Sequence, residues 1–521
     1  MEFMLPESPL TTIESRLRYL LPSEMYVSMW GNPSVEVMIQ VHNHLRTLQR
    51  ILHDYTSRQI DITKLKPGDV KTEWQYGTMM FTDLAGFTKL MEANASKGRE
   101  GAENLLKELT KYFSTMISII SKSGGELVEF TVDAMLVMFP KKTGKSDDAS
   151  RAIRAGLRMQ RAMKDFAEIQ TPTGIVNLKM RIGVHSGKFL TAEIGTPRRM
   201  EHVLLGKDVQ KAKLTESNGA NERVNVSESG YDLAKNDFRF EDGNPEYHLV
   251  VDDLTAENLG DYEITPMGRR MASSVLFDKK DKKEVLNNII ELLNSIEPLA
   301  SYIPDPILSM LVESAADRRI PPDFPEPTIM FVNFIGLPEA ADRALPGEER
   351  KLAASFSKAF SLINAVVEAR GGVLKKVTYH LSGSDIVIYF GVPNAHTNNE
   401  MRAASAAVAI REVVEGINAK APTIGGIKPE VYCQIGINKG PAFVAEVGDP
   451  RGRREFNVLG DTVNTAARLM NRAQKNQIVV SEPIKRVVEE KYECVSLGAI
   501  SLKGKKDAMN LYDMVRKIPK N

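Results

Sequence analysis

Cysteine is almost missing from this chain of 521 residues, which contains only Cys433 and Cys494. Two cysteines cannot build a disulfide scaffold or a cysteine-based zinc ribbon, so the sequence predicts a reducing, cytoplasmic location. An excess of charge of one sign is also missing, because 68 basic residues balance 67 acidic ones and leave a net charge of +1. This balance gives no reason to expect a nucleic acid or an anionic membrane as a partner.

Long hydrophobic runs are missing as well. No stretch reaches the roughly 18 consecutive apolar residues that a membrane helix needs, and the first residues lack the basic segment and apolar core of a secretory signal. We therefore expect neither a membrane span nor secretion. The composition, 42% hydrophobic and 26% charged, is typical of globular proteins. A length prior of about 100 to 200 residues per domain predicts more than one domain.

A repeat with an offset of about 250 residues organises the chain. Solenoid repeats have periods of about 20 to 50 residues, so this offset indicates a duplicated domain instead. The matching segments are Phe81–Phe87 with Phe331–Leu337, Gly124–Leu127 with Gly371–Leu374, Arg181–Gly187 with Gln434–Gly440, and Val203–Gly206 with Asn457–Gly460.

Strand and helix signals alternate within the first copy. Thr78–Thr82 is short, apolar and β-prone, and a helical stretch follows over about Glu103–Ser121. Leu127–Phe139 is apolar on both sides of Asp133 and predicts a hairpin, and a second helix is expected over about Asp148–Ile169. Strands interleaved with helices predict an α+β or α/β sandwich.

The remaining segments are expected to be helical. Ser34–Tyr55 and Phe277–Ala300 carry apolar residues at helical spacing, and Pro321–Pro325 interrupts the chain before the second copy, with a boundary near Arg319. The predicted division is an N-terminal helical extension over 1–74, a first domain over 75–235, a linker with helices over 236–324 and a second domain over 325–521.

Two carboxylates of the first copy are candidates for metal binding. Asp83 is expected at the end of a buried strand, and Asp133 at the tip of the hairpin. A buried aspartate is costly unless a proton, an arginine or a metal satisfies it. Carboxylates without nearby histidine or cysteine favour Mg²⁺ or Mn²⁺, whereas the ordinary alternative is that each aspartate caps a turn.

The second copy supplies a complementary pair on one helix face. After the turn at Gly460, Asn464 and Arg468 lie four residues apart. An amide that holds a sugar hydroxyl and a guanidinium that meets phosphate charge would suit a nucleotide. Taken alone, an asparagine and an arginine on a helix more often form a solvated face.

Three motifs together resemble the class III adenylyl and guanylyl cyclases. They are FTDLAGFT over Phe81–Thr88, EFTVDAML over Glu129–Leu136 and GDTVNTAARL over Gly460–Leu469. The resemblance covers most of the chain. The arrangement of the motifs in two halves is most similar to the soluble, tandem-domain adenylyl cyclase subclass. It implies two ferredoxin-like (βαββαβ) α+β domains that pair within one molecule as a pseudo-heterodimer and share an active site.

The resemblance also implies an activity. We expect an adenylate cyclase that converts ATP to 3′,5′-cyclic AMP and pyrophosphate with two divalent cations, Mg²⁺ or Mn²⁺. Asp83, Asp133 and the carbonyl of Leu84 match the metal ligands, and Asn464 and Arg468 match the ribose-orienting and transition-state residues. The expected phosphate contacts are the turn residues Gly86, Phe87 and Thr88, together with Lys503.

The base-reading residues are open to two alignments. Lys376 matches the adenine-contacting lysine of the soluble subclass, whereas the membrane-bound enzymes would place His380 there. Asn457 stands where the family has aspartate or threonine, and an amide can bind adenine without excluding guanine. ATP is favoured because the glutamate common in guanine-specific enzymes is absent from Lys376–His380.

The pseudo-symmetric second site is expected to be non-catalytic. Asn333 and Ser384 replace the metal aspartates, while Gln210 and Leu214 replace the ribose asparagine and the arginine. Asp385 follows Ser384, but a shift of one residue along a strand points a side chain to the other face.

This degenerate pocket is expected to be either vestigial or a site for a regulatory ligand, and a vestigial pocket is the more common case. Arg199 matches an anion-binding arginine, although Glu129 stands where the accompanying lysine is expected. Two rival functions are a guanylate cyclase and a catalytically inactive nucleotide-binding protein. The second is motivated by Val132, which replaces the glycine usual before the second metal aspartate.

Overall fold

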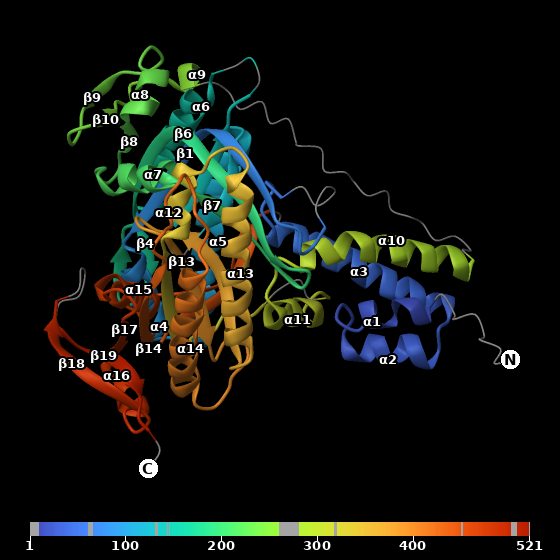
Figure 1. Cartoon of the computed structure of the whole chain (residues 1–521). Coiled ribbons are helices and arrows are strands. Elements are labelled where there is room, and N and C mark those ends of the chain that lie inside the picture. The colour runs from blue at the N-terminus through green and yellow to red at the C-terminus, as the bar shows by residue number, and fades with distance from the viewer. Residues whose placement is uncertain are drawn as a thin grey trace.

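The chain folds into two α+β halves that face each other (Figure 1). The computed structural model describes residues 10–60, 66–130, 134–142, 144, 146–259, 281–316, 320–449, 452–501 and 508–519. Each sequence repeat builds its own sheet, and helices cover the outer faces.

The sheet of the first half has two long strands at its centre. The long strands β1 (Lys71–Ala85) and β6 (Lys179–Thr196) pair along their length at its centre. The spatial order is β2 (Glu126–Phe130), β3 (Ala134–Pro140), β1, β6, β8 (Val224–Ser227), β10 (Tyr247–Val250) and β9 (Phe240–Asp242), with β7 (Arg199–Leu205) paired to β6. A separate hairpin joins β4 (Ile169–Thr171) and β5 (Gly174–Val176).

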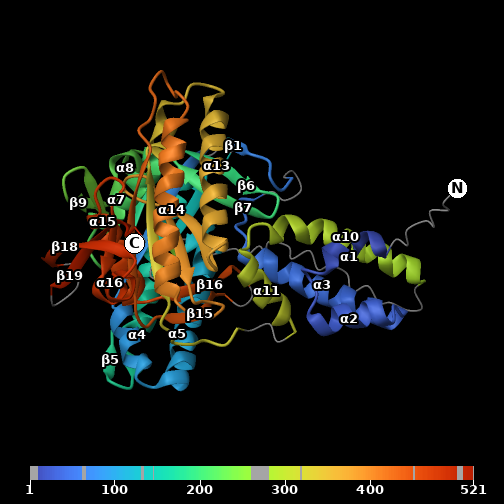
Figure 2. The same ribbon diagram turned by 60° about the horizontal axis from the view of Figure 1, so that its bottom comes forward.

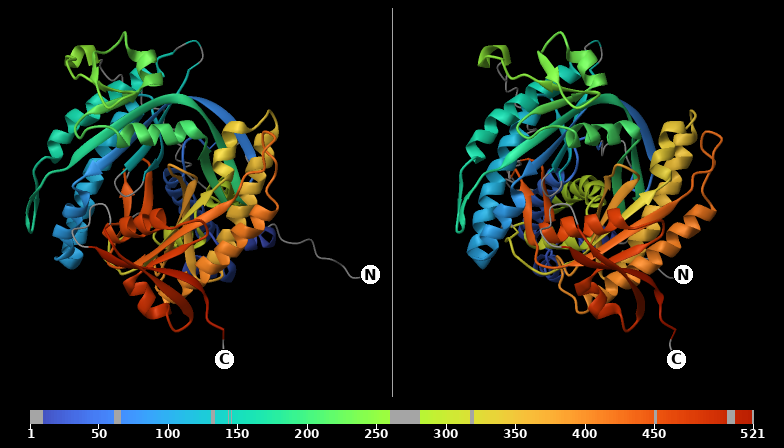
Figure 3. Two further views of the ribbon diagram at one scale, coloured as in Figure 1. Left: turned by 60° about the vertical axis from the view of Figure 1, so that its left-hand side comes forward. Right: turned by 90° about the vertical axis from the view of Figure 1, so that its left-hand side faces the viewer.

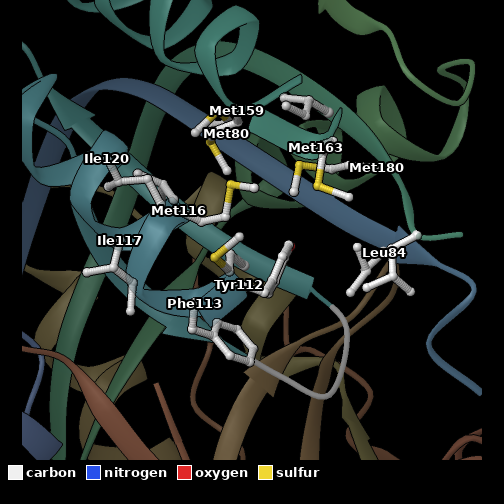
Figure 4. Close-up of a cluster of buried hydrophobic side chains, with 14 of the residues drawn as sticks. Met80, Leu84, Tyr112, Phe113, Met116, Ile117, Ile120, Met159, Met163 and Met180 are labelled. Carbon is white, nitrogen blue, oxygen red and sulfur yellow. The ribbon is translucent and has the colours of Figure 1, made fainter. Parts of the chain in front are cut away.

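Helices with apolar stripes cover this sheet. Tyr112, Phe113 and Met116 of the long helix α5 are buried over methionines of the sheet and of α6, such as Met80 and Met159 (Figure 4). The helices of this half are α4 (Phe87–Ala95), α5 (Gly98–Lys122), α6 (Asp148–Ala162), η2 (Met163–Phe166), α7 (Lys207–Ser217), α8 (Glu228–Ala234) and α9 (Ala256–Leu259). The second predicted helix therefore ends near Phe166, before the expected Ile169, where β4 begins.

The second half repeats this plan. Its sheet has the order β12 (Gly372–Tyr379), β13 (Ser384–Phe390), β11 (Thr328–Ile335), β14 (Tyr432–Lys439), β17 (Ile478–Ser481), β19 (Met509–Lys517) and β18 (Tyr492–Ile500). A separate hairpin joins β15 (Phe443–Gly448) and β16 (Arg454–Leu459). Its helices are α12 (Leu337–Ala340), η3 (Ala341–Arg343), α13 (Glu348–Glu368), α14 (Asn399–Ala419), α15 (Asp461–Arg472) and α16 (Glu482–Val488).

Both halves have a ferredoxin-like core. In each half, strand, helix, two strands, helix and strand follow one another, and the four strands lie in the order β2-β3-β1-β6 or β12-β13-β11-β14. The predicted α+β fold with two βαββαβ domains is confirmed. The halves differ in the last strand of this core. In the first half β6 runs unbroken, whereas its counterpart β14 ends at Lys439, before Gly440 and Pro441. Proline has no amide hydrogen for the sheet ladder, so the chain restarts as the separate strand β15.

The two halves complete each other's hydrophobic cores. The buried residues Phe443, Ala445, Val447 and Leu459 of the β15–β16 hairpin belong to the core of the first half. In return, the end of β6 and β7 place Leu190, Ile194 and Val203 in the core of the second half. Figure 3 shows the two halves, drawn from blue to green and from yellow to red, facing each other. The expected pairing within one molecule is therefore present in the structure.

Replacing Phe443 tests this exchange. Phe443 is fully buried in the core of the first half although it belongs to the second. We expect Phe443→Ala to lower the free energy of unfolding by about 3–5 kcal/mol, because it leaves a large cavity. Urea denaturation of the whole chain measures the change. Leu233→Ala, at a side chain that is 44% exposed, is the control. A loss at Phe443 no larger than at Leu233 would contradict the packing described here.

A helical arm projects from the side of the paired halves (Figure 2). The helices α3 (Val35–Tyr55) and α10 (Lys282–Ala300) pack together, as expected for their apolar stripes, and the Ser34 hydroxyl caps α3 by accepting from the amide of Val37. The other elements of the arm are η1 (Thr11–Ile13), α1 (Glu14–Leu17), α2 (Ser23–Gly31) and α11 (Asp305–Glu313). The expected boundary at Arg319 lies outside the described residues.

The base of the arm is fixed to the second half. The Tyr55 hydroxyl donates to Glu446 at 2.6 Å, and Arg454 lies 3.4 Å from Asp54. Among the helices that the structure describes, none is long and apolar enough to cross a bilayer.

Candidate active site

A cavity of about 340 Å³ lies between the two halves. It brings together four residues predicted from the sequence, Asp83 of the first half and Lys376, Asn457 and Asn464 of the second. The other lining residues are Ala134, Lys213, Phe331, Thr378, Tyr379, His380, Leu381, Asp385, Val387, Tyr389, Val458, Val463, Ala467 and Asn471. The cavity therefore joins the candidate metal carboxylate to the candidate nucleotide contacts.

Asp83 lies near the end of β1, between two neighbouring strands. Its cross-strand partners are Ala134 of β3 and Arg181 of β6. The Arg181 guanidinium is 2.5 Å from Oδ2 of Asp83 and 3.1 Å from the buried Glu216. This ion pair holds the Asp83 carboxyl group in place at the edge of the cavity.

The oxygen donors near Asp83 suit a hard divalent cation. Leu84 follows Asp83 with its side chain buried in the core, so its backbone carbonyl is the one oxygen that it could offer to a cation. Asp133 lies outside the described residues, but it directly precedes Ala134, the cross-strand partner of Asp83. Carboxylate and carbonyl oxygens are the ligands that Mg²⁺ and Mn²⁺ prefer. The metal roles of Asp83, Leu84 and Asp133 stay predictions.

The turn after β1 requires glycine and starts α4. Gly86 has a φ of 97°, and a Cβ there would lie 2.6 Å from the carbonyl oxygen of Asn177. Phe87 follows with its side chain buried in the core, and Thr88 is half-buried. The first backbone amides of a helix have no partner within the helix, so this turn offers N–H donors of the kind predicted for a triphosphate.

Helix α15 begins against the first half. Gly460, with a φ of 132°, precedes the helix, and a Cβ there would lie 2.5 Å from the sulfur of Met91 in α4. This close contact holds the start of α15 against α4 and places Asn464 at the cavity. Arg468 lies one turn further along and is not among the lining residues. Its Nη1 is 3.8 Å from Asp461 and, within the described part of the chain, donates no hydrogen bond, so the guanidinium keeps donor capacity for a phosphate.

Lys376 bridges the two halves. Its ammonium lies 3.0 Å from Glu129 of the first half and 3.6 Å from Glu455 of the second. Burial opposes its charge, but the two carboxylates outweigh burial and raise the pKa of Lys376 well above its usual range. Lys376 is therefore a fixed cation at the cavity. The alternative base-reading residue is His380, and its Nδ1 accepts a hydrogen bond from Nδ2 of Asn333 at 3.1 Å.

Asn457 is almost completely enclosed. It is 3% exposed, and its Nδ2 has no hydrogen-bond partner among the residues that the structure describes. A buried amide without a partner costs about 1–3 kcal/mol, so this donor is set up for a group that enters the cavity. Lys503, the last predicted phosphate contact, lies outside the described residues.

A smaller cavity of about 90 Å³ also lies between the halves and the arm. Ser384, which replaces a metal aspartate, lines this cavity together with Glu129, Glu201 and Arg453. Asn333, Gln210 and Leu214 are not among its described lining residues. Its walls carry acidic and basic side chains that pair with each other, such as Arg453 with Glu455 at 2.5 Å.

Arg199 is already held by protein groups. It is 4% exposed, its guanidinium lies 2.9 Å from Glu201, and it donates to the carbonyls of Leu374 and Lys375 at 3.3 and 3.2 Å. An anion at Arg199 would have to compete with the Glu201 carboxylate. The predicted regulatory role of Arg199 stays a prediction.

Lys213 and Asp385 line the cavity but were not among the expected contacts of this site, since Asp385 was considered only for the degenerate site. Lys213 comes from α7 of the first half, and Asp385 comes from β13, where it alternates with Val387 and Tyr389 on the face toward the cavity. Successive side chains of a strand point to opposite faces, so Ser384 and Asp385 were bound to face different sides of β13. Ser384 lines the smaller cavity and Asp385 lines the larger one. No motif marked Lys213.

Sequence comparison gives one family. The model for the adenylate and guanylate cyclase catalytic domain matches residues 70–250 and 322–515. Adenylate cyclase 1 of Rhizobium meliloti (strain 1021) is 28% identical over 230 residues, which cover 43% of this chain and 32% of that protein. Human adenylate cyclase type 10 is 21% identical over 404 residues, which cover 76% of this chain and 24% of that protein. The chain thus spans about a third and about a quarter of these relatives.

Structural comparison supports the tandem arrangement. A class III adenylyl cyclase-like ATP-binding protein from Pseudomonas aeruginosa matches over 86% of this chain and 92% of its own, with a TM-score of 0.55 and 14% identity. This likeness shows a shared fold across both halves. With two matched segments and two ferredoxin-like halves that meet at one cavity, the chain belongs to the family of class III adenylate and guanylate cyclase catalytic domains.

Proposed function

We propose that this chain is an adenylate cyclase that converts ATP to 3′,5′-cyclic AMP and pyrophosphate at one site between its halves. The observation that carries this proposal is the single cavity in which Asp83 of the first half faces Lys376, Asn457 and Asn464 of the second. The first half supplies the candidate metal carboxylate to this cavity, and the second half supplies the candidate base and ribose contacts. We also propose a cytoplasmic location, from the scarcity of cysteine.

The ribose and the phosphates are positioned by residues of both halves. Asn464 would hold the ribose, and the amides of Phe87 and Thr88 at the start of α4 would hold phosphate oxygens. Asp83, Asp133 and the carbonyl of Leu84 would hold two divalent ions, Mg²⁺ or Mn²⁺. Such ions, when bound, lower the pKa of the ribose 3′-hydroxyl and neutralise phosphate charge.

The reaction is an intramolecular displacement on ATP. The 3′-oxygen attacks the α-phosphorus, its proton leaves to water, and the bond to the bridging oxygen breaks to release pyrophosphate. The guanidinium of Arg468 would meet the charge that builds on the α-phosphate and bridging oxygen. Its location one turn beyond Asn464 supports this role if the bound triphosphate extends along α15.

The preference for ATP rests on Lys376 and Asn457. The fixed ammonium of Lys376 can donate to an acceptor nitrogen of the adenine ring, and the unpartnered amide of Asn457 can donate to the ring or turn its oxygen toward the 6-amino group. The mirror-related site is proposed to be non-catalytic, because Asn333 and Ser384 cannot supply the negative charge that divalent ions need.

Turnover by the purified chain tests the proposal. We expect cyclic AMP from ATP with Mg²⁺ or Mn²⁺, and a lower kcat/KM for GTP. Mass spectrometry of the products distinguishes the rivals. A product ratio that favours cyclic GMP would establish a guanylate cyclase, and nucleotide binding without turnover in either metal would establish an inactive nucleotide-binding protein.

A further inference from the structure

Asp385 is a buried acid on the wall of the larger cavity between the halves, which is called the nucleotide cavity from here on. It lies on β13 between its cross-strand partners Asn333 of β11 and Thr378 of β12. The side chain is 7% exposed, and it lines the same cavity as Lys376 and Asn457. Its Oδ1 has no hydrogen-bond partner among the described residues.

Two complementary groups are therefore unsatisfied in one cavity. Besides the Asp385 oxygen, Nδ2 of Asn457 is buried without a partner in the described part of the structure. Each such group costs about 1–3 kcal/mol, and a carboxylate more, unless a ligand or water satisfies it. Both come from the half that carries Lys376, the expected base-reading lysine. Their location on this wall points to a flat ligand with donors and acceptors along its edge.

We propose that Asp385 reads the hydrogen-bonding edge of the purine base and so sets the preference between ATP and GTP. This inference rests on the proposed function, because it deepens the specificity of the same site. It adds an acid on β13 to the expected contacts from Lys376 and Asn457.

The two protonation states of a carboxyl group match different purines. A neutral carboxyl group donates through its O–H and accepts through its C=O, which complements N1 and the 6-amino group of adenine. A carboxylate only accepts, which complements the N1–H and 2-amino groups of guanine. The neutral acid therefore favours ATP, and the carboxylate favours GTP.

The surroundings of Asp385 keep the neutral form accessible near neutral pH. Burial raises its pKa to about 7, with a smaller lowering by His380 and a smaller raising by Glu129. The other titratable groups that line the cavity are Asp83 and Lys213 from the first half and Lys376, Tyr379 and Tyr389 from the second. Since the pKa is raised, the neutral form dominates below about pH 7, and the carboxylate dominates above it.

The test compares the wild type with Asp385→Asn at pH 6 and pH 8. The measured quantity is kcat/KM for ATP divided by kcat/KM for GTP. In the wild type we expect this ratio to fall about tenfold from pH 6 to pH 8, which corresponds to one hydrogen bond to the base. Asparagine keeps one donor and one acceptor without titrating, so the variant should hold the high ratio at both pH values. Ser384→Ala, on the opposite face of β13, is the matched control and should behave as the wild type.

Two outcomes would overturn the inference. A wild-type ratio that is the same at both pH values would do so without any variant. A pH dependence that persists unchanged in Asp385→Asn would assign it to another group, such as His380. Equilibrium binding of ATP and GTP with Ca²⁺ gives the same comparison without turnover. If binding discriminates as expected but no cyclic product forms, the proposed function fails while the role of Asp385 stands.

Discussion

Asp83→Ala is expected to lower kcat for cyclic AMP formation by at least about 10³-fold, with a much smaller change in nucleotide affinity. A metal-binding carboxylate contributes several kcal/mol to the stabilisation of a phosphoryl-transfer transition state, and about 1.4 kcal/mol corresponds to tenfold in rate. Asp83 is the described carboxylate of the first half that lines the nucleotide cavity. Initial rates and equilibrium nucleotide binding, measured on the same preparation, separate the two effects.

The Asp83 variant needs a control for general damage. Removing Asp83 leaves the Arg181 guanidinium with Glu216 at 3.1 Å, so the strand pair retains an ion pair. Asp69→Asn, in an exposed turn just before β1, changes a carboxylate that does not line the cavity and should keep full activity. Equal activity of Asp83→Ala and the wild type would remove the metal assignment and with it the proposed mechanism.

Arg468→Ala is expected to lower kcat by about 10²- to 10³-fold and to leave KM for ATP almost unchanged. Removing a donor that stabilises charge only in the transition state has an effect of this size on kcat. Arg468→Lys should restore only part of the rate, because an ammonium lacks the planar fork of donors that a guanidinium offers to phosphate oxygens.

Arg472 provides the matched control for Arg468. It lies one turn further along α15, is exposed, and does not line the cavity. Arg472→Ala should therefore have nearly wild-type kcat. If Arg468→Ala raised KM and left kcat intact, Arg468 would act in ground-state binding, and the transition-state role would have to pass to another cation such as Lys213.

Much of the fold could be predicted because its signals are periodic or repeated. The repeat at about 250 residues placed matching strands in both halves, and the apolar spacing of Ser34–Tyr55 predicted a helix that the structure has as α3. The end of the helix after Asp148 was predicted less well, since helical and strand periods overlap where η2 leads into β4. The exchange of strands between the cores left no local signal, because it depends on how the halves pair.

The site could be predicted only in part for a similar reason. Motifs identified Asp83, Asn457 and Asn464, which the structure brings to one cavity. The pairing of Lys376 with Glu129, residues about 250 positions apart, joins two halves and cannot be read from either segment alone. Asp385 was noticed and set aside because it faces away from the degenerate site. That orientation is what turns it toward the nucleotide cavity.

The side chains that each half buries in the core of the other also affect whether either half can be produced alone. A half produced alone would expose the apolar faces that its counterpart normally covers, including Phe443 in one and Leu190 in the other. Large exposed patches of this kind promote aggregation. The second half is therefore expected to be needed for the solubility and folding of the first, whatever its own pocket binds.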